Sequence, residues 1–260
     1  MRAPSVVILG LGRAAGVACA RRYSDAGWAV TIVDSSQKNL DRAEDDLGDL
    51  ANYLHEDQST KLGLKNALSG TLEQFEGVDA VIHIPPVPDA VPLQEMDLSQ
   101  FAQDFEKSAM TSLMAGKIFG SEMIREIREH ELNTERPPYP KSLLQILGIS
   151  AIRCDVGSVG PSIAQGSMLP VMKALAVEYA PYGIRSNAIV AIRSRSEEIE
   201  PWLKERTPLG RAVRSREIAD TAFFSTSAEA GFITAHSFVL DGGRSALNGL
   251  SVEPEPKSED

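Results

Sequence analysis

Short apolar runs alternate with helical patterns along this chain of 260 residues, and no other feature limits its fold as strongly. Ser5–Leu9 is an apolar run of strand length, and Ala14–Ala26, after a glycine-rich turn, has the spacing of a helix. Strands that are apolar on both faces are typical of a parallel sheet covered by helices on both sides. Right-handed crossovers between such strands give a doubly wound sheet. We therefore predict an α/β fold of the Rossmann type.

The alternation continues into the C-terminal part of the chain. Further strands are predicted at Trp28–Val33, Ala80–Ile84, Leu143–Leu147, Arg185–Ile192 and Ser237–Leu240. Helices are predicted at Asn39–Leu50, Lys61–Phe75, Leu98–Glu129, Gly160–Ala180 and Arg216–Ser227. Because neither a repeat nor a linker interrupts the pattern, residues 1–250 are expected to form a single domain. Residues 251–260 are acidic and contain proline, and we expect a disordered tail there.

The composition argues against several classes of function. Lys and Arg number 26 against 36 Asp and Glu, so the formal net charge is −10. An acidic chain without a Lys/Arg block is unsuited to nucleic acid or an anionic membrane as its main partner. The two cysteines, Cys19 and Cys154, are too few for a disulfide framework and indicate reduced thiols in a cytoplasmic protein. We predict no metal site.

Three glycines, Gly10, Gly12 and Gly16, lie between the first predicted strand and the first predicted helix. Glycines allow a tight turn, and their missing side chains let a pyrophosphate approach the helix N-terminus, where free N–H groups favour an anion. The spacing has one residue more before the last glycine than the G-x-G-x-x-G pattern. An ordinary strand-to-helix turn therefore remains an alternative.

Asp34 ends the second predicted strand, eighteen residues after Gly16. A carboxylate there can accept hydrogen bonds from the 2′- and 3′-hydroxyls of an adenosine ribose and would repel the 2′-phosphate of NADP. The alternative is that Asp34 caps the following helix. Arg13 argues for NADP(H) instead, because a cation in the turn could bind a 2′-phosphate. Together, the turn and the carboxylate favour NAD(H) over NADP(H) as the ligand.

The chain resembles the short-chain dehydrogenase/reductase family over residues 5–250. Gly10, Gly12 and Gly16 stand where that family has its Thr-Gly-x-x-x-Gly-x-Gly loop, although Leu9 replaces the Thr and Ala14 the middle Gly. The later segments that resemble the family, in the same order, are Ala174–Asn187, Thr207–Arg211, Glu217–Ala219, Phe232–Thr234 and Asp241–Gly243. The resemblance implies that Asp57, after the third strand, contacts the adenine ring.

The resemblance does not extend to the catalytic residues. Enzymes of the family use a Tyr as general acid/base, a Lys four residues later that lowers the Tyr pKa and holds the nicotinamide ribose, and a Ser after the fifth strand. Counting without gaps, these positions hold Pro161, Gln165 and Gly148. Proline and glycine offer no side-chain proton, and a neutral amide cannot lower the pKa of a phenol. Pro170 should also bend the helix that carries the first two positions, because it lacks the N–H that would bond to Gly166.

Two other residues are candidates for a replacement mechanism. His83 lies at the end of the predicted strand Ala80–Ile84, facing the expected cofactor cleft, and could donate a proton near neutral pH. Ser150 follows Gly148 by two residues and could reach the site from a bulged loop. The alternatives are that His83 is a hydrogen-bonded histidine of the core and that Ser150 is an ordinary serine of a loop.

Three functional hypotheses follow. The leading one is a non-catalytic family member that binds NAD(H) or a related adenine nucleotide as a structural or sensing ligand. The second is an NAD-dependent oxidoreductase that acts on a carbonyl or alcohol through His83 or Ser150. The third is a structural subunit that pairs with itself or with an active relative. We expect a homodimer or homotetramer, because Met168, Leu169, Met172 and Leu175 form an apolar stripe on the second of two long predicted helices; the alternative is that this stripe faces the protein's own sheet.

Overall fold

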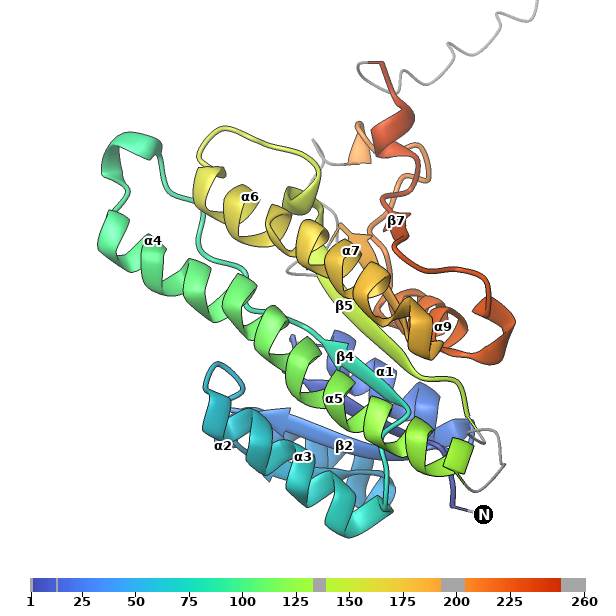
Figure 1. Ribbon diagram of the computed structural model, residues 1–260. Coiled ribbons are helices and arrows are strands. Elements are labelled where there is room, and N and C mark those ends of the chain that lie inside the picture. The colour runs from blue at the N-terminus through green and yellow to red at the C-terminus, as the bar shows by residue number, and fades with distance from the viewer. Residues whose placement is uncertain (1, 13, 133–138, 193–203, 249–260) are drawn as a thin grey trace, which may run out of the picture.

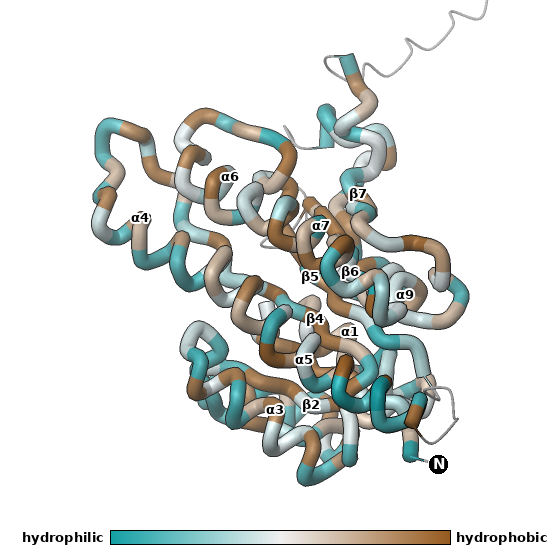
Figure 2. The backbone as a smooth tube through the Cα atoms, viewed as in Figure 1, coloured by the Kyte–Doolittle hydropathy of each residue, from teal (hydrophilic) through white to brown (hydrophobic). Residues whose placement is uncertain are grey.

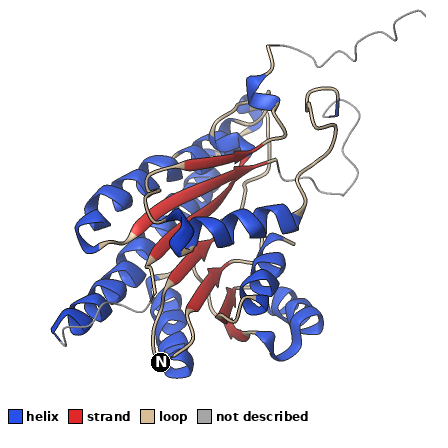
Figure 3. Cartoon of the chain, turned by 90° about the vertical axis from the view of Figure 1, so that its right-hand side faces the viewer, coloured by secondary structure: helices blue, strands red, loops and turns tan. Residues whose placement is uncertain are grey.

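The computed structural model describes residues 2–12, 14–132, 139–192 and 204–248. Its apolar strands form one parallel sheet of seven strands in the order β3-β2-β1-β4-β5-β6-β7 (Figure 3). The predicted Rossmann-type fold is therefore confirmed. The tail predicted for residues 251–260 lies outside the described residues.

The strands lie within one or two residues of the predicted ranges where the sequence located them. They are β1 Ser5–Leu9, β2 Ala29–Asp34, β3 Asn52–His55, β4 Ala80–His83, β5 Ser142–Gly148, β6 Arg185–Ala191 and β7 Ser237–Leu240. The apolar pattern did not locate β3, an edge strand whose side chains are only partly buried. The register pairs Leu9 with His83 and His83 with Gln145, so the carboxyl ends of the central strands meet at one edge of the sheet.

Helices cover both faces of the sheet (Figure 1). They are α1 Ala15–Asp25, α2 Gln37–Leu47, α3 Lys61–Phe75, α4 Leu98–Phe105, α5 Thr111–Leu132, α6 Val159–Gly166, α7 Met168–Tyr179 and α9 Ser215–Thr226. Side chains of α1, α2 and α9 pack on one face, and those of α3, α5 and α7 on the other. Along β1 the side chains alternate between the two faces of the sheet: Val6 and Ile8 pack against the first layer, and Val7 and Leu9 against the second. The hydrophobic residues of the strands thus run through the centre of the molecule (Figure 2).

Both long predicted helices are interrupted. The first contains a π-helical segment, Glu106–Met110, which separates α4 from α5. The second is interrupted at Ser167, three residues before Pro170, and becomes α6 and α7. This is the bend expected from the missing N–H of Pro170.

The apolar stripe of α7 packs on the protein's own sheet. Met168 and Met172 are fully buried, Leu175 is nearly so, and Leu169 is partly buried and packs against the cluster of the two methionines. The first three side chains therefore belong to the core and provide no surface for another subunit. Among the described residues, no helix is long and apolar enough to cross a bilayer.

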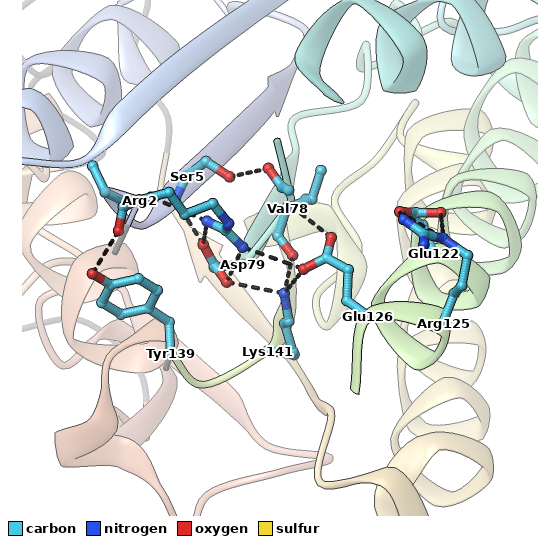
Figure 4. Close-up of polar contacts among 11 residues, drawn as sticks. Arg2, Ser5, Val78, Asp79, Glu122, Arg125, Glu126, Tyr139 and Lys141 are labelled. Carbon is cyan, nitrogen blue, oxygen red and sulfur yellow. Dashed lines mark hydrogen bonds and ion pairs between the residues drawn. The ribbon is translucent and has the colours of Figure 1, made fainter. Parts of the chain in front are cut away.

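Four charged side chains form a compact cluster where β4 and β5 begin (Figure 4). Arg2 donates to both carboxylate oxygens of Asp79, at 2.5 and 3.0 Å, and to Glu126 at 3.2 Å. Lys141 Nζ bonds to Asp79 Oδ1 at 3.0 Å, to the carbonyl of Val78 at 2.8 Å and to Glu126. Only 3% of the Lys141 side chain and none of the Asp79 side chain is exposed. The cluster is balanced in charge and joins the N-terminal segment, α5 and the starts of two strands.

Lys141→Met is expected to lower the free energy of unfolding by about 3–5 kcal/mol, because it leaves two buried carboxylates with a single cation. The matched control is Arg125→Met. Arg125 is 52% exposed and pairs with Glu122 (Figure 4) and with Glu129 on the surface of α5, so its replacement should cost less than about 1 kcal/mol. Urea unfolding monitored by circular dichroism measures both. Equal losses in the two variants would contradict a stabilising role of the cluster.

Candidate functional site

The turn after β1 is built on glycines that no other residue could replace without a shift of the backbone. Gly10 has a φ of +84°, and a Cβ there would lie 2.6 Å from the carbonyl oxygen of Ile84. A Cβ on Gly16 would lie 2.6 Å from the carbonyl oxygen of Leu11, to which the Gly16 N–H donates at 2.8 Å. Gly12 also has a positive φ, of +50°. Arg13 lies outside the described residues.

The first helix begins directly after this turn and presents its N-terminus to the sheet edge. Ala14 is the N-cap residue of α1, no side-chain cap hydrogen bond is made there by the described residues, and the first turn contains no acidic residue. Free N–H groups at such a helix start, together with the helix dipole, favour an anionic group. The turn therefore has the form expected of a phosphate-binding loop, although its glycines are also explained by packing within the chain.

Asp34 lies directly beside the turn. Its Oδ2 accepts a hydrogen bond from Leu11 N at 3.0 Å, and its Oδ1 accepts from Ser36 N at 2.9 Å and Asn39 Nδ2 at 3.2 Å. The residue is only 6% exposed. The carboxylate thus fastens the glycine turn to the end of β2 and holds the N–H of Ser36 just before α2. Ser36 is the N-cap residue of α2, so Asp34 is not the cap that the alternative expected. Among the described groups a single donor reaches Oδ2, so this oxygen retains capacity to accept a bond from a ribose hydroxyl.

Asp57 is exposed at the end of β3 and organises the start of α3. Its Oδ1 accepts from Ser59 N at 2.9 Å and from Ser59 Oγ at 2.6 Å. Thr60 then caps the helix by accepting a bond from Gly63 N at 3.0 Å. The adenine contact implied by the resemblance remains a prediction.

Gln58 is a residue of this edge that the sequence did not single out. Its Nε2 lies 3.4 Å from the position that a Cβ on Gly10 would occupy, so the amide lies against the glycine turn. Its Oε1 is buried and has no hydrogen-bond partner among the described residues. A buried acceptor without a donor is unfavourable, and a ligand with an N–H or O–H group would satisfy it. In the sequence, only the position next to Asp57 could have drawn attention to Gln58, and the orientation of its side chain is known only from the structure.

The three counted catalytic positions lie together at the end of β5. Gln165 is completely buried; its Oε1 accepts from Gly148 N at 2.8 Å, and its Nε2 donates to the carbonyl oxygen of Pro86 at 3.2 Å. Pro161 is buried one turn earlier on α6. Ser150 Oγ lies 3.5 Å from the position that a Cβ on Gly148 would occupy. The sequence named these positions, but it did not predict the link that Gln165 makes between β5 and the segment after β4.

His83 is buried beneath α5, whereas its position at the end of β4 suggested a side chain facing an open cleft. Its ring lies on the sheet face that α5 and α7 cover, and Nδ1 is 3.0 Å from Ser112 Oγ. Ser112 in turn donates to Met168 Sδ at 3.0 Å. His83 Nε2 has no partner among the described residues, and burial lowers the pKa of the ring to about 4. With this lowered pKa the ring is neutral at pH 7, so the imidazolium form, the stronger proton donor, is scarce there.

His83→Asn should reduce the acid sensitivity of the fold. Because the folded-state pKa is lowered from about 6.5 to about 4, the unfolded chain binds a proton between these values that the folded protein does not. The contribution to stability is complete above pH 6.5 and is lost as the pH falls toward 4, by at most about 3 kcal/mol. Urea unfolding between pH 7.5 and 4.5 should show a smaller decline for His83→Asn than for the wild type. The control is His55→Asn, at an exposed position; a decline as steep in His83→Asn as in this control would contradict the assignment.

A cavity of about 580 Å³ lies between the segment after β4, α4 and the start of α6. Its lining residues are Pro86, Val87, Pro88, Asp89, Val91, Glu95, Met96, Asp97, Gln100, Phe101, Asp104, Lys107 and Gly160. Asp97 is engaged in capping α4, and Asp104 accepts a bond from Gln100. This lining does not include the three counted positions. No group of His, Cys, Asp or Glu in the described residues is arranged to hold a metal ion.

Comparison with known proteins agrees with the fold. The family model described as enoyl-(acyl carrier protein) reductase matches residues 10–245. Meso-2,3-butanediol dehydrogenase from Serratia marcescens is 25% identical over 252 residues, which cover 94% of this chain and 95% of that protein. A 2,5-dichloro-2,5-cyclohexadiene-1,4-diol dehydrogenase from Sphingobium indicum is 24% identical over 255 residues, with 94% and 97% covered.

Solved structures show the same architecture. The 3-ketoacyl-(acyl-carrier-protein) reductase from Brucella melitensis, in complex with NADH, has a TM-score of 0.80 at 22% identity over 94% of this chain and 99% of that one. A short chain dehydrogenase from Bacillus anthracis has a TM-score of 0.81 at 20% identity, with 95% and 98% covered. The chain thus has the fold of NAD(P)-dependent oxidoreductases. It belongs to the short-chain dehydrogenase/reductase family.

Proposed function

We propose that this protein binds NAD(H) as a structural or sensing ligand and does not carry out the redox reaction typical of its family. The observation that carries the proposal is Gln165. At the position where the family's lysine is expected, a buried neutral amide has both of its polar atoms bonded within the protein.

The residues that would hold the dinucleotide lie at the ends of β1, β2 and β3. The glycine turn of Gly10, Gly12 and Gly16 and the N-terminus of α1 suit the pyrophosphate. Asp34 Oδ2 suits a ribose hydroxyl, and Asp57 and Gln58 suit the adenine end. When bound in an active relative, the nicotinamide ring supplies hydride transfer.

Among the described residues, none of the three counted catalytic positions at this edge can supply the proton that must accompany a hydride. Gly148 and Pro161 carry no side-chain proton, and Gln165 brings no positive charge that would lower the pKa of an acid. His83 is neutral at pH 7 and is enclosed by α5. Positioning of the reactants would be the main remaining contribution to a rate.

A working oxidoreductase is the second candidate, and Ser150 is the observation that favours it. Its hydroxyl lies 3.5 Å from the Cβ position of Gly148, where the family's serine is expected, so it could polarise a substrate oxygen. This candidate still needs a proton donor. A structural role in a homodimer, a homotetramer or a complex with an active relative is compatible with either candidate.

NADH should bind at least tenfold more tightly than NADPH, because a 2′-phosphate would approach the Asp34 carboxylate. Asp34→Ala should weaken the binding of NADH and reduce the difference between the affinities for NADH and NADPH to less than threefold. Isothermal titration calorimetry measures the four dissociation constants. Asp220→Ala, which removes an exposed carboxylate on α9, is the control and should change none of them. Equal or tighter binding of NADPH by the wild type would overturn the NAD(H) assignment.

The protein should show no more than trace NADH-dependent reduction of ketones, quinones or acyl thioesters. General acid–base catalysis is typically worth 10²–10⁴-fold, and the groups that supply it act as a unit. Turnover is followed by the loss of NADH absorbance. A rate above about 1 s⁻¹ on any carbonyl or alcohol would refute the non-catalytic proposal. Loss of such a rate in Ser150→Ala, but not in His83→Asn, would then assign the reaction to Ser150.

A further inference from the structure

The two ends of the expected dinucleotide cleft differ in whether their polar groups are already satisfied. Each end has a glutamine whose amide lies against a glycine. Gln58, against Gly10, has a buried Oε1 without a partner among the described residues. Gln165, against Gly148, has both amide atoms bonded. The first amide keeps an acceptor oxygen with no bond among the described residues, whereas each polar atom of the second already makes one bond inside the protein.

The segment after β4 covers the Gln165 end. Gln165 donates to the carbonyl oxygen of Pro86, and Val87 Cγ2 lies 3.9 Å from the Cβ position of Gly148. Pro86 and Val87 are exposed, whereas Gln165 and Gly148 beneath them are buried. The chain therefore encloses the residue that stands where the family's lysine would hold the nicotinamide ribose.

Two properties make this cover difficult to displace. Pro85, Pro86 and Pro88 fix three φ angles within four residues, so the segment is stiff. Withdrawal of the Gln165 amide would also leave the Gly148 N–H, at the buried end of β5, without its acceptor. A nicotinamide ribose would have to replace both hydrogen bonds in order to bind there.

We infer that this site recognises an adenosine 5′-diphosphate group and that the chain itself closes the nicotinamide-ribose half. This inference rests on the proposed function, because it assigns the ligand class of the same cleft. ADP and ADP-ribose are then complete ligands. NAD(H) binds through its adenosine diphosphate half, and its nicotinamide remains in solvent. The closure also accounts for the absence of a proton donor, because no reacting carbon would be held at the Gln165 end.

The first experiment compares the affinities of NADH and ADP-ribose for the wild-type protein by calorimetry. The expected dissociation constants differ by less than tenfold, because the nicotinamide adds no contact. A constant for NADH that is tenfold or more lower than that for ADP-ribose would overturn the inference and leave the proposed function intact. Failure of NADH, ADP-ribose and ADP all to bind at about 1 mM would instead refute the proposed function.

A second experiment needs no variant and reports on the nicotinamide directly. In saturation-transfer difference NMR with NAD⁺, the adenine H2 and H8 protons should receive saturation, and the nicotinamide protons should receive less than about a fifth as much. Comparable transfer to both rings would overturn the inference.

The two glutamines provide matched variants. Gln165→Lys releases the amide bonds and restores a cation at the ribose position, so the preference for NADH over ADP-ribose should rise at least tenfold. Gln58→Leu removes the acceptor at the adenosine end of the cleft, so it should weaken the binding of NADH and of ADP-ribose by the same factor. A loss confined to NADH in Gln58→Leu would contradict the assignment of the two ends. If Gln165→Lys fails to fold, the two wild-type measurements still decide the question.

Discussion

The parallel sheet is the constraint on which the rest of this molecule depends. Because every strand runs in the same direction, the chain must return along a helix after each one, and all strands end at the same edge. That edge collects Gly10, Asp34, Gly148 and the segment after β4, which are widely separated in the sequence. Because helices cover both faces of the strands, the polar residues next to the strands lie at the strand ends. This edge is therefore where we expect a ligand to bind.

Opposite ends of the strands show two ways of burying polar groups. Where β4 and β5 begin, Lys141 is enclosed by two carboxylates and a backbone carbonyl, the set of partners that a buried ammonium group needs. Where β5 ends, the partners of Gln165 are one backbone N–H and one backbone carbonyl. These groups give each polar atom of a neutral amide one partner and provide no negative charge for a lysine. The choice of glutamine and the path of the Pro86 segment are thus parts of one arrangement.

The sequence predicted the fold well because apolar periodicity is a local signal. The predicted bounds of β1, α3 and β7 agree with the structure to the residue. It failed at β3, whose half-buried residues Asn52–His55 form no apolar run, and at the π-helical segment Glu106–Met110, which no residue type marks. Pro170 did mark the other interruption. In the site, the closeness of Asp34 to the glycine turn follows from adjacent parallel strands. The orientation of Gln58 and the bond from Gln165 to Pro86 join segments far apart in the chain and could not be predicted.

The structure also explains why the three counted positions cannot be considered one at a time. A side chain at Gly148 has room, because the nearest atom to its Cβ position is Ser150 Oγ at 3.5 Å. A lysine at position 165 would release the acceptor of Gly148 N and the donor to Pro86 O together, so it would loosen the cover over that same side chain. A tyrosine at position 161 would have to fit where a proline is now buried, at the start of a helix that Pro170 already interrupts. Each change alters the environment that the next one needs, and this coupling is the reason their effects would not add.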